Sequence, residues 1–396
     1  MKQAFDVVHA MRPGLLQLQA LPPLSLYVHL PWCIQKCPYC DFNSHQGHEN
    51  IPEQAYLQAL LKDLNNDLHW VKNRKLHSIF FGGGTPSLFS AQSIENIISA
   101  AEKHIGFEAN IEITLEANPG SAEQQKFADF YTAGVNRLSI GVQSFNDQHL
   151  KSLGRIHSAE HAKKAIEMAQ KSGFERFNID LMHGLPEQSR EDAMVDLDIA
   201  IQTGATHISW YQLTIEPNTR FFSRPPVLPE EDQLADIQDL GMHKLSSAGF
   251  SQYEVSAFGK AGEACRHNLN YWQFGDYLGI GAGAHGKLTM PENAEIVRTA
   301  KTRQPEHFMS REKTAIATQK PINPDQLSLE FMMNALRLTQ GVNKELYAQR
   351  TGLNPSAIAE LISQLEEDGL LSSQAANYCT TDRGMRYLDS VLQRFS

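Results

Sequence analysis

The fold is decided by one stretch near the N-terminus, Leu24-Ser25-Leu26-Tyr27-Val28-His29-Leu30-Pro31-Trp32-Cys33-Ile34-Gln35-Lys36-Cys37-Pro38-Tyr39-Cys40. A strand-like apolar run leads directly into three cysteines spaced C-x3-C-x2-C, in a chain that has only five cysteines. A [4Fe–4S] cluster is usually held by four cysteines, so three would leave one iron open to an exchangeable ligand. The alternative is a zinc site completed by Asp41, His29 or His45.

Six β-rich runs alternate with amphipathic stretches between residues 24 and 214, a pattern that predicts a parallel sheet with helices outside. The expected strands are Leu24–Leu30, Leu76–Phe81, Ile111–Glu116, Arg137–Gln143, Arg176–Leu181 and His207–Leu213. Residues able to carry chemistry fall at the C-terminal ends of these strands, which is the rim where parallel barrels assemble their sites. We therefore predict an α/β fold, a partial (β/α)6 TIM-like barrel, rather than an open doubly wound sheet.

The remaining sequence predicts a second domain. Residues 1–23 form an N-terminal extension, and the barrel with its own C-terminal extension covers 24–298, including a helix over 232–248 and a strand over 250–258. Residues 299–320 are polar without clear periodicity and are expected to be a linker. Residues 321–396 predict a winged-helix-like α+β domain. Because that domain has six Lys or Arg against nine Asp or Glu, an interaction or lid role is favoured over DNA binding.

The composition narrows the class of function. The net charge of −10 argues against nucleic-acid binding, which needs a cationic surface. No apolar run approaches the roughly 20 residues of a membrane span, and residues 1–20 lack a secretory signal pattern. An odd number of cysteines, three of them on one loop, does not suit a disulfide framework. We therefore expect a reducing, cytoplasmic compartment.

Further candidate residues stand at later strand ends. The triplet Gly82-Gly83-Gly84, followed by Thr85-Pro86, would let backbone atoms approach a ligand closely. Glu116 could accept hydrogen bonds from a ribose. Asp180 places a charge inside a largely apolar strand, where a carboxylate needs a partner.

Together these motifs resemble the oxygen-independent coproporphyrinogen dehydrogenase branch of the radical S-adenosylmethionine (SAM) proteins. The resemblance covers nearly the whole chain and implies that Cys33, Cys37 and Cys40 hold a [4Fe–4S] cluster whose open iron chelates SAM. It also implies a set of SAM-pocket residues: Tyr27, Tyr39, Gly83, Gly84, Thr85, Glu116, Gln143, Arg155 and Asp180.

Two features instead resemble the HemW branch, the radical-SAM-type haem chaperones. Cys40 is followed by Asp41-Phe42, whereas the dehydrogenases carry an extra cysteine two residues after the third. The sequence His267-Asn268-Leu269-Asn270-Tyr271-Trp272 is similar to the signature of that branch, and Gly275–Gly286 also resembles it. This implies haem ligated by His267, with Asn268, Tyr271 and Trp272 around it, since imidazole is a good axial ligand and aromatic rings offer flat apolar surface.

Other ligands and functions stay open. His183, Cys265 and His285 are rival haem ligands, and the chain has no C-x-x-C-H motif for a thioether attachment. We expect a haem chaperone that binds haem and transfers it to acceptor haemoproteins while carrying a SAM-bound cluster. The alternative is an oxygen-independent coproporphyrinogen III dehydrogenase. A radical SAM enzyme acting on RNA is disfavoured by the acidic charge.

Overall fold

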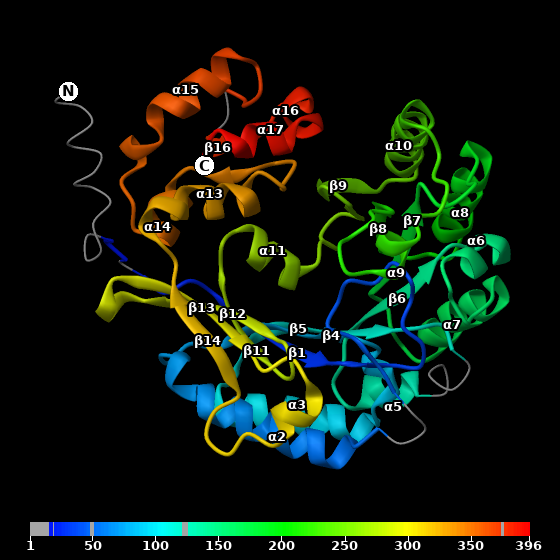
Figure 1. Cartoon of the computed structure of the whole chain (residues 1–396), viewed down its shortest axis with the longest axis horizontal. Helices are drawn as coiled ribbons and strands as arrows, with labels where there is room; N and C mark the ends of the chain where they lie inside the picture. Colours follow the sequence, from blue (N-terminus) through cyan, green and yellow to red (C-terminus); the bar gives the residue numbers. More distant parts are fainter. Residues whose placement is uncertain (1–15, 19, 48–50, 121–125, 374–375) are drawn as a thin grey trace.

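The computed structural model describes residues 16–18, 20–47, 51–120, 126–373 and 376–396. A large sheet forms its centre, with strand order β14-β13-β12-β11-β1-β4-β5-β6-β7-β8-β10-β9 (Figure 1). Its middle consists of six successive parallel strands, β1 (Leu24–Leu30), β4 (Leu76–Gly83), β5 (Phe107–Ala117), β6 (Arg137–Gln143), β7 (Phe177–His183) and β8 (His207–Gln212). All six predicted strands are confirmed. The sheet stays open because β8 pairs with β10 instead of closing onto β1.

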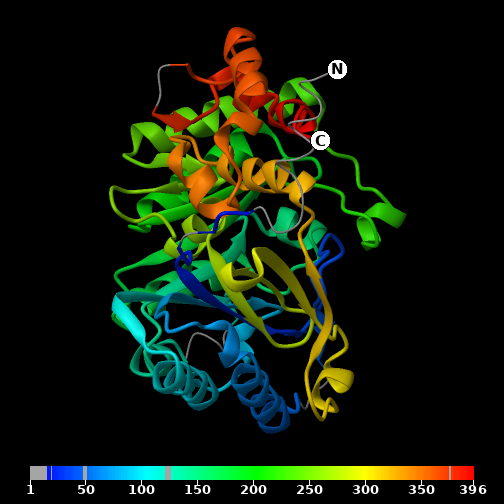
Figure 2. The same ribbon diagram turned by 90° about the vertical axis from the view of Figure 1, so that its left-hand side faces the viewer.

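Helices cover the outer face of the parallel strands, as Figures 1 and 2 show. They are α2 (Glu53–Asp67), α3 (Ala91–His104), α5 (Phe127–Thr132), α6 (Asp147–Ser152), α7 (Ala159–Lys171), α8 (Arg190–Gln202) and α10 (Glu231–Ser247). Serine side chains cap α3, α7 and α8, with Ser90, Ser158 and Ser189 each accepting a backbone N–H of the first turn. The buried helix faces and β-strands share one apolar core, so the predicted partial (β/α)6 barrel is confirmed.

An extension widens the sheet on both sides of the barrel. On one side a hairpin of β9 (Ser251–Glu254) and β10 (Ala257–Gly259) follows α10, so the single strand expected over 250–258 is wrong. The chain turns at residues 255–256 and the second strand pairs with β8. On the other side β11 (Asp276–Ile280) lies parallel to β1, and β12 (His285–Met290) pairs antiparallel to β11. The short helix α11 (Arg266–Trp272) connects the two sides.

The expected linker over 299–320 is also wrong. This segment contains the end of β13 (Glu295–Lys301), the helix α12 (Pro305–Met309) and most of β14 (Ile316–Pro321). β13 pairs with β12, and β14 pairs with β13 as the edge of the large sheet. The sequence looks polar because β14 is an edge strand whose side chains are mostly exposed, so it lacks the apolar alternation of a strand packed on a core.

The C-terminal domain packs on this extension. Its elements are α13 (Pro324–Ala335), β15 (Val342–Asn343), α14 (Glu345–Thr351), α15 (Ala359–Glu367), β16 (Asn377–Tyr378), α16 (Asp382–Arg386) and α17 (Leu388–Gln393). The two short strands pair antiparallel, which gives the predicted α+β composition. The core of the domain includes Phe274 and Ile296 of the extension, and Leu16 and Leu18 from the predicted N-terminal extension, most of which lies outside the described residues. No helix in the described ranges is long and apolar enough to cross a membrane.

Candidate cofactor site

The three clustered cysteines lie on the loop after β1, at the C-terminal rim of the barrel. Cys33, Cys37 and Cys40 all line a cavity of about 570 Å3 inside that rim, which we call the first cavity. The same cavity is lined by eight of the predicted SAM-pocket residues, Tyr39, Gly83, Gly84, Thr85, Glu116, Gln143, Arg155 and Asp180. Tyr27 lies outside this cavity. The fold thus brings together residues of the cysteine loop and of the parallel strands that are separated by up to 179 residues in the sequence, from Cys33 to Gln212.

The glycine triplet packs directly against the start of the cysteine loop. Gly84 donates its N–H to Leu30 O at 2.8 Å, and a Cβ at Gly84 would lie 2.5 Å from Trp32 O. Gly83 has φ of +112°, and a Cβ there would meet the His29 ring at 2.5 Å. Only glycine allows this approach, so the triplet fixes the position of the cysteine loop relative to β4.

Two half-buried carboxyl groups face the first cavity. Glu116 accepts the Gly83 N–H at 3.3 Å, and burial beside Asp180 raises the pKa of the Glu116 carboxyl to about 8. Burial also raises the pKa of Asp180, whereas hydrogen bonds that it accepts from Ser139 (2.9 Å) and Asn178 (2.7 Å) lower it. A cationic ligand between these carboxyl groups would favour their ionised forms.

Several cavity residues were not predicted from the sequence. Asn118 donates to Thr85 Oγ1 at 2.8 Å and accepts from Arg155 Nη2 at 2.6 Å, which links two strand ends. Tyr211 donates its hydroxyl to Gln143 Oε1 at 2.7 Å, and Gln143 itself has φ of +70°. The position of Asn118, directly after the end of β5, could have identified it. Nothing in the sequence singles out Tyr211.

The thiols have the surroundings that a cluster requires. Arg155 Nη1 lies 3.6 Å from Cys37 Sγ, a hydrogen bond that would stabilise a thiolate. Burial raises the pKa of the Cys33 thiol to about 11, although a hydrogen bond with Thr85 opposes this, so loading a metal there must release the proton. Among the described residues no three His, Cys, Asp or Glu side chains converge on one metal ion. In a cluster, by contrast, each cysteine binds a separate iron. These residues therefore fit a [4Fe–4S] cluster.

A second cavity, of about 590 Å3, adjoins the first. Residues Asp41, Phe42, Gly83 and Glu116 line both cavities. Its other lining residues come from β1, the segment just after the cysteines, the extension and the C-terminal domain. They are Tyr27, His29, Asn43, Tyr271, Trp272, Phe274, Tyr277, Gly283, His285, Lys287, Arg298, Arg303 and Asn334. Phe42, which stands where the dehydrogenases have a cysteine, is 61% exposed at its edge.

The residues of the motif His267–Trp272 on α11 line different cavities. Tyr271 and Trp272 line the second cavity, and Asn268 lines the first. His267 is buried beneath the helix, where Nδ1 lies 2.9 Å from Ser78 Oγ and Nε2 lies 2.9 Å from the Tyr271 hydroxyl. Burial lowers the pKa of His267 to about 3, so the ring is neutral. Ligation of iron by this imidazole would require that its contact with either Ser78 or Tyr271 break.

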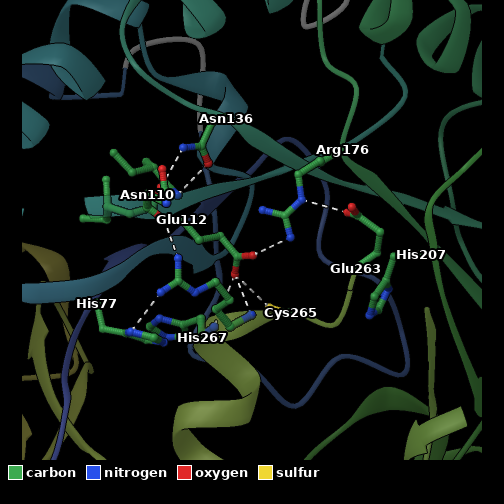
Figure 3. A network of polar contacts seen from close by, with 12 residues as sticks. His77, Asn110, Glu112, Asn136, Arg176, His207, Glu263, Cys265 and His267 are labelled. Atoms are coloured by element: carbon green, nitrogen blue, oxygen red, sulfur yellow. Dashed lines mark hydrogen bonds and ion pairs between the residues drawn. The ribbon is translucent and has the colours of Figure 1, made fainter. Parts of the chain in front are cut away.

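A buried carboxylate holds α11 in place, as Figure 3 shows. Glu112 of β5 accepts the backbone N–H of Arg266 at 2.8 Å and of His267 at 3.3 Å, so it caps the first turn of the helix. Its other oxygen pairs with Arg176 at 3.1 Å, and Arg176 also pairs with Glu263 at 2.8 Å. The motif is thus anchored to the barrel core from below.

The three rival ligands lie in different surroundings. Cys265 is buried against Glu112, and burial raises the pKa of its thiol to about 12. His183 is buried against the ring of Trp210, with 4.2 Å between the ring centroids. His285 is exposed at the start of β12 and lines the second cavity. Only the last of these presents its side chain to either cavity.

Comparison with known proteins places the chain in a family. A model of the radical SAM superfamily matches residues 27–199, and a model of the HemN C-terminal domain matches residues 322–387. Heme chaperone HemW of Haemophilus influenzae is 51% identical over 379 residues, which cover 95% of this chain and 98% of that protein. Heme chaperone HemW of Escherichia coli is 48% identical over 375 residues, covering 95% and 98%. The chain belongs to the HemW family of radical SAM proteins.

Membership in this family implies a [4Fe–4S] cluster and SAM. The cysteines are therefore assigned to the cluster rather than to a zinc site. The solved structure of coproporphyrinogen III oxidase (HemN) from Escherichia coli, a radical SAM enzyme, is also similar to the chain. The TM-score is 0.78 at 21% sequence identity, and the match covers 99% of this chain and 93% of that one. At this identity the likeness concerns the fold, which includes both the barrel and the C-terminal domain.

Proposed function

We propose that the protein binds haem and transfers it to acceptor haemoproteins, and that it carries a SAM-bound [4Fe–4S] cluster beside the haem. One observation carries this proposal: Tyr271 and Trp272 of the α11 motif form a wall of the second cavity, which adjoins the first cavity. Its volume lies in the range of about 300–1,000 Å3 that is usual for ligand pockets. The names of the HemW relatives support the same function.

The cluster and SAM are proposed to occupy the first cavity. Cys33, Cys37 and Cys40 would hold the cluster, and SAM would contact the eight predicted residues that line this cavity. Tyr27 lies in the second cavity, with its hydroxyl 3.0 Å from His29 Nδ1, so we propose that it supports the wall between the two ligands. SAM bound to a reduced cluster supplies radical chemistry.

The alternative, a coproporphyrinogen III dehydrogenase, is tested side by side with haem binding. The cluster is reconstituted without oxygen, haemin is titrated by difference absorbance, and coproporphyrinogen III is supplied with SAM and a strong reductant. We expect one haem per chain and no consumption of coproporphyrinogen. Turnover of coproporphyrinogen without haem binding would establish the dehydrogenase function instead.

The motif on α11 is tested by single substitutions. Tyr271→Ala and Trp272→Ala should weaken haem binding through lost apolar contact, with the Soret position unchanged. His267→Ala should also weaken it, because His267 either ligates iron or holds Tyr271. Exposed Tyr131 on α5 provides the matched control, Tyr131→Ala, which should bind haem as the wild type does. Equal affinity of all four proteins would exclude the motif from the haem site.

Transfer is tested with an apo-haemoprotein from the same cell. A transfer rate that rises with acceptor concentration indicates direct hand-over, whereas a constant rate equal to haem dissociation indicates passive release. We also propose the reducing, cytoplasmic location expected from the sequence, which agrees with five free thiols.

A further inference from the structure

The histidines near the second cavity differ in what their rings contact. The His29 ring lies 3.0 Å from the Tyr27 hydroxyl and 3.1 Å from Asn43 O, so both of its nitrogens are occupied. Both nitrogens of His267 are occupied as well. The His285 ring has no hydrogen-bond partner among the described residues and is exposed on the cavity wall. Of these three imidazoles, His285 alone presents a free nitrogen to a ligand.

The chain holds His285 beside the cysteine loop. Asn43, three residues after Cys40, donates to Ala282 O and to Arg303 O, both at 2.9 Å. Gly283 has φ of +82°, and a Cβ there would lie 2.2 Å from Asn43 Nδ2, so glycine is required for this contact. The glycine-rich segment before His285 therefore serves to bring this histidine next to the loop that carries the cluster cysteines.

A buried cluster of charged side chains also holds the glycine-rich segment that precedes His285. Lys301 Nζ lies 2.6 Å from Asp63 Oδ1 and 2.6 Å from Asp67 Oδ2, and all three side chains are buried. The other oxygen of Asp63 accepts the Gly281 N–H at 3.1 Å. A wall built on such a network keeps its shape when no ligand is bound, which favours a preformed site.

The charges around the second cavity leave one cation without a partner. Lys287 pairs with Asp276 at 3.1 Å, and Arg298 pairs with Glu330 and donates to the Tyr277 hydroxyl at 2.9 Å. The Arg303 guanidinium is exposed and forms no ion pair or hydrogen bond within the described part of the chain. In a chain of net charge −10, a free arginine on a cavity wall is suited to a carboxylate ligand.

Part of the wall of the second cavity is aromatic. The Tyr271 and Tyr277 rings meet edge to face with 4.5 Å between centroids, and Arg337 lies over the Trp272 ring at 4.4 Å. The indole Nε1 of Trp272 is buried and has no hydrogen-bond partner among the residues described. Because this nitrogen has no accessible surface, the indole offers a ligand apolar contact rather than a hydrogen bond.

We infer that haem sits in the second cavity with His285 as an axial ligand of the iron and with one propionate on Arg303. This inference rests on the proposed function and specifies its site. The aromatic wall would cover one face of the macrocycle. His267 is then a positioning residue, which acts through its contact with Tyr271. Phe42, shared by both cavities, would separate the haem from SAM.

The axial ligand is tested on the full-length, cluster-loaded protein by haemin titration, with spectra taken as differences against the same sample without haemin. His285→Ala should shift the Soret band and lower haemin affinity, and added imidazole should restore the wild-type position. His267→Ala should lower affinity with the Soret position kept. His243→Ala removes an exposed histidine on α10 and is the matched control. Circular dichroism and cluster absorbance establish that each variant is folded.

The propionate contact is tested with haemin and with haemin dimethyl ester, in which both propionates are masked. Arg303→Ala should lower affinity for haemin about tenfold to a hundredfold, as expected for a lost charge-assisted hydrogen bond. Affinity for the dimethyl ester should not change. Arg224→Ala, which removes another exposed arginine, should leave both affinities unchanged.

The outcomes separate this inference from the proposed function. A wild-type Soret position and affinity in His285→Ala would overturn the axial assignment while haem binding by the wild type still stands. If His285→Ala does not fold, His285→Met replaces it and should give a Soret position different from that of the wild type; the wild-type position there would also overturn the assignment. Equal losses of haemin and dimethyl ester in Arg303→Ala would overturn the propionate contact. A wild type that binds no haem would overturn the proposed function itself.

Discussion

The anchoring of α11 by Glu112 makes the sharpest prediction about the link between fold and site. Glu112→Ala removes the acceptor of two backbone N–H groups at the start of the helix and one partner of Arg176. The Glu112 side chain is fully buried, so these donors would be left without water. Each buried, unpaired donor costs about 1–3 kcal/mol.

Loss of the Glu112–Arg176 ion pair should cost less free energy of unfolding than loss of a fully buried pair. Breaking such a pair costs about 3–5 kcal/mol, but the Arg176 side chain is 30% exposed and keeps its contact with Glu263. We therefore expect Glu112→Ala to destabilise the protein by about 3–5 kcal/mol in total. Glu112→Gln retains one acceptor oxygen for the helix, and we expect it to cost only about 1–2 kcal/mol.

Hydrogen exchange measured by mass spectrometry on the peptide that contains α11 isolates the local effect. Amides at the start of this helix should exchange at least about a hundredfold faster in Glu112→Ala than in the wild type. The affinity of Glu112→Ala for haemin should fall, because Tyr271 and Trp272 lie on the same helix. The absorbance of the cluster should not change.

Glu108→Ala is the matched control. Glu108 lies on the same strand, pairs with His77 at 3.1 Å and is 43% exposed, so its loss should cost less than about 1 kcal/mol. If Glu112→Ala left both the exchange of α11 and haemin affinity at wild-type values, the carboxylate would not be what holds the motif, and the reasoning would be refuted.

Three further predictions concern the first cavity. The Cys33→Ala/Cys37→Ala/Cys40→Ala variant should retain no cluster after anaerobic reconstitution, measured as iron and sulfide per chain, while Cys265→Ser and Cys379→Ser should retain it. Gly84→Ala should weaken cluster retention because its Cβ would displace the backbone at Trp32, whereas Gly47→Ala, with ordinary contacts no closer than 3.5 Å, should not; equal retention by both would contradict the packing argument. Since the Glu116 carboxyl has its pKa raised to about 8, its stabilising contribution is present below about pH 4.5 and is lost as the pH rises through about 8. Without SAM, Glu116→Gln should therefore be more stable than the wild type in urea unfolding at pH 8.5, by up to about 5 kcal/mol at about 1.36 kcal/mol per pKa unit, and by less than about 1 kcal/mol at pH 5. A difference independent of pH would exclude a neutral Glu116.

The sequence by itself determined the parallel strands and the position of the cysteine loop. Strand β1 runs from Leu24 to Leu30 as predicted, because an apolar run bounded by proline specifies a buried strand locally. The same local information placed the cysteines, the glycine triplet and Glu116 at strand ends, and parallel strands bring their C-terminal ends to one rim. The family was indicated by a resemblance, carried by the cysteine loop, by Phe42 and by the motif His267–Trp272, and the HemW relatives confirm it.

Only the tertiary structure decided which side chains face a ligand. His267 and His285 both stand in motifs of the extension, yet one is buried against Ser78 and Tyr271 and the other is exposed on a cavity wall. The partners that decide this are remote in sequence: Glu112 lies 155 residues before His267, and Asn43 lies 260 residues before Arg303. Local periodicity carries no information about such contacts, and for the same reason the polar edge strand β14 was predicted to be a linker. Burial and hydrogen bonding are properties of the assembled sheet, so they emerge only when the strands are in place.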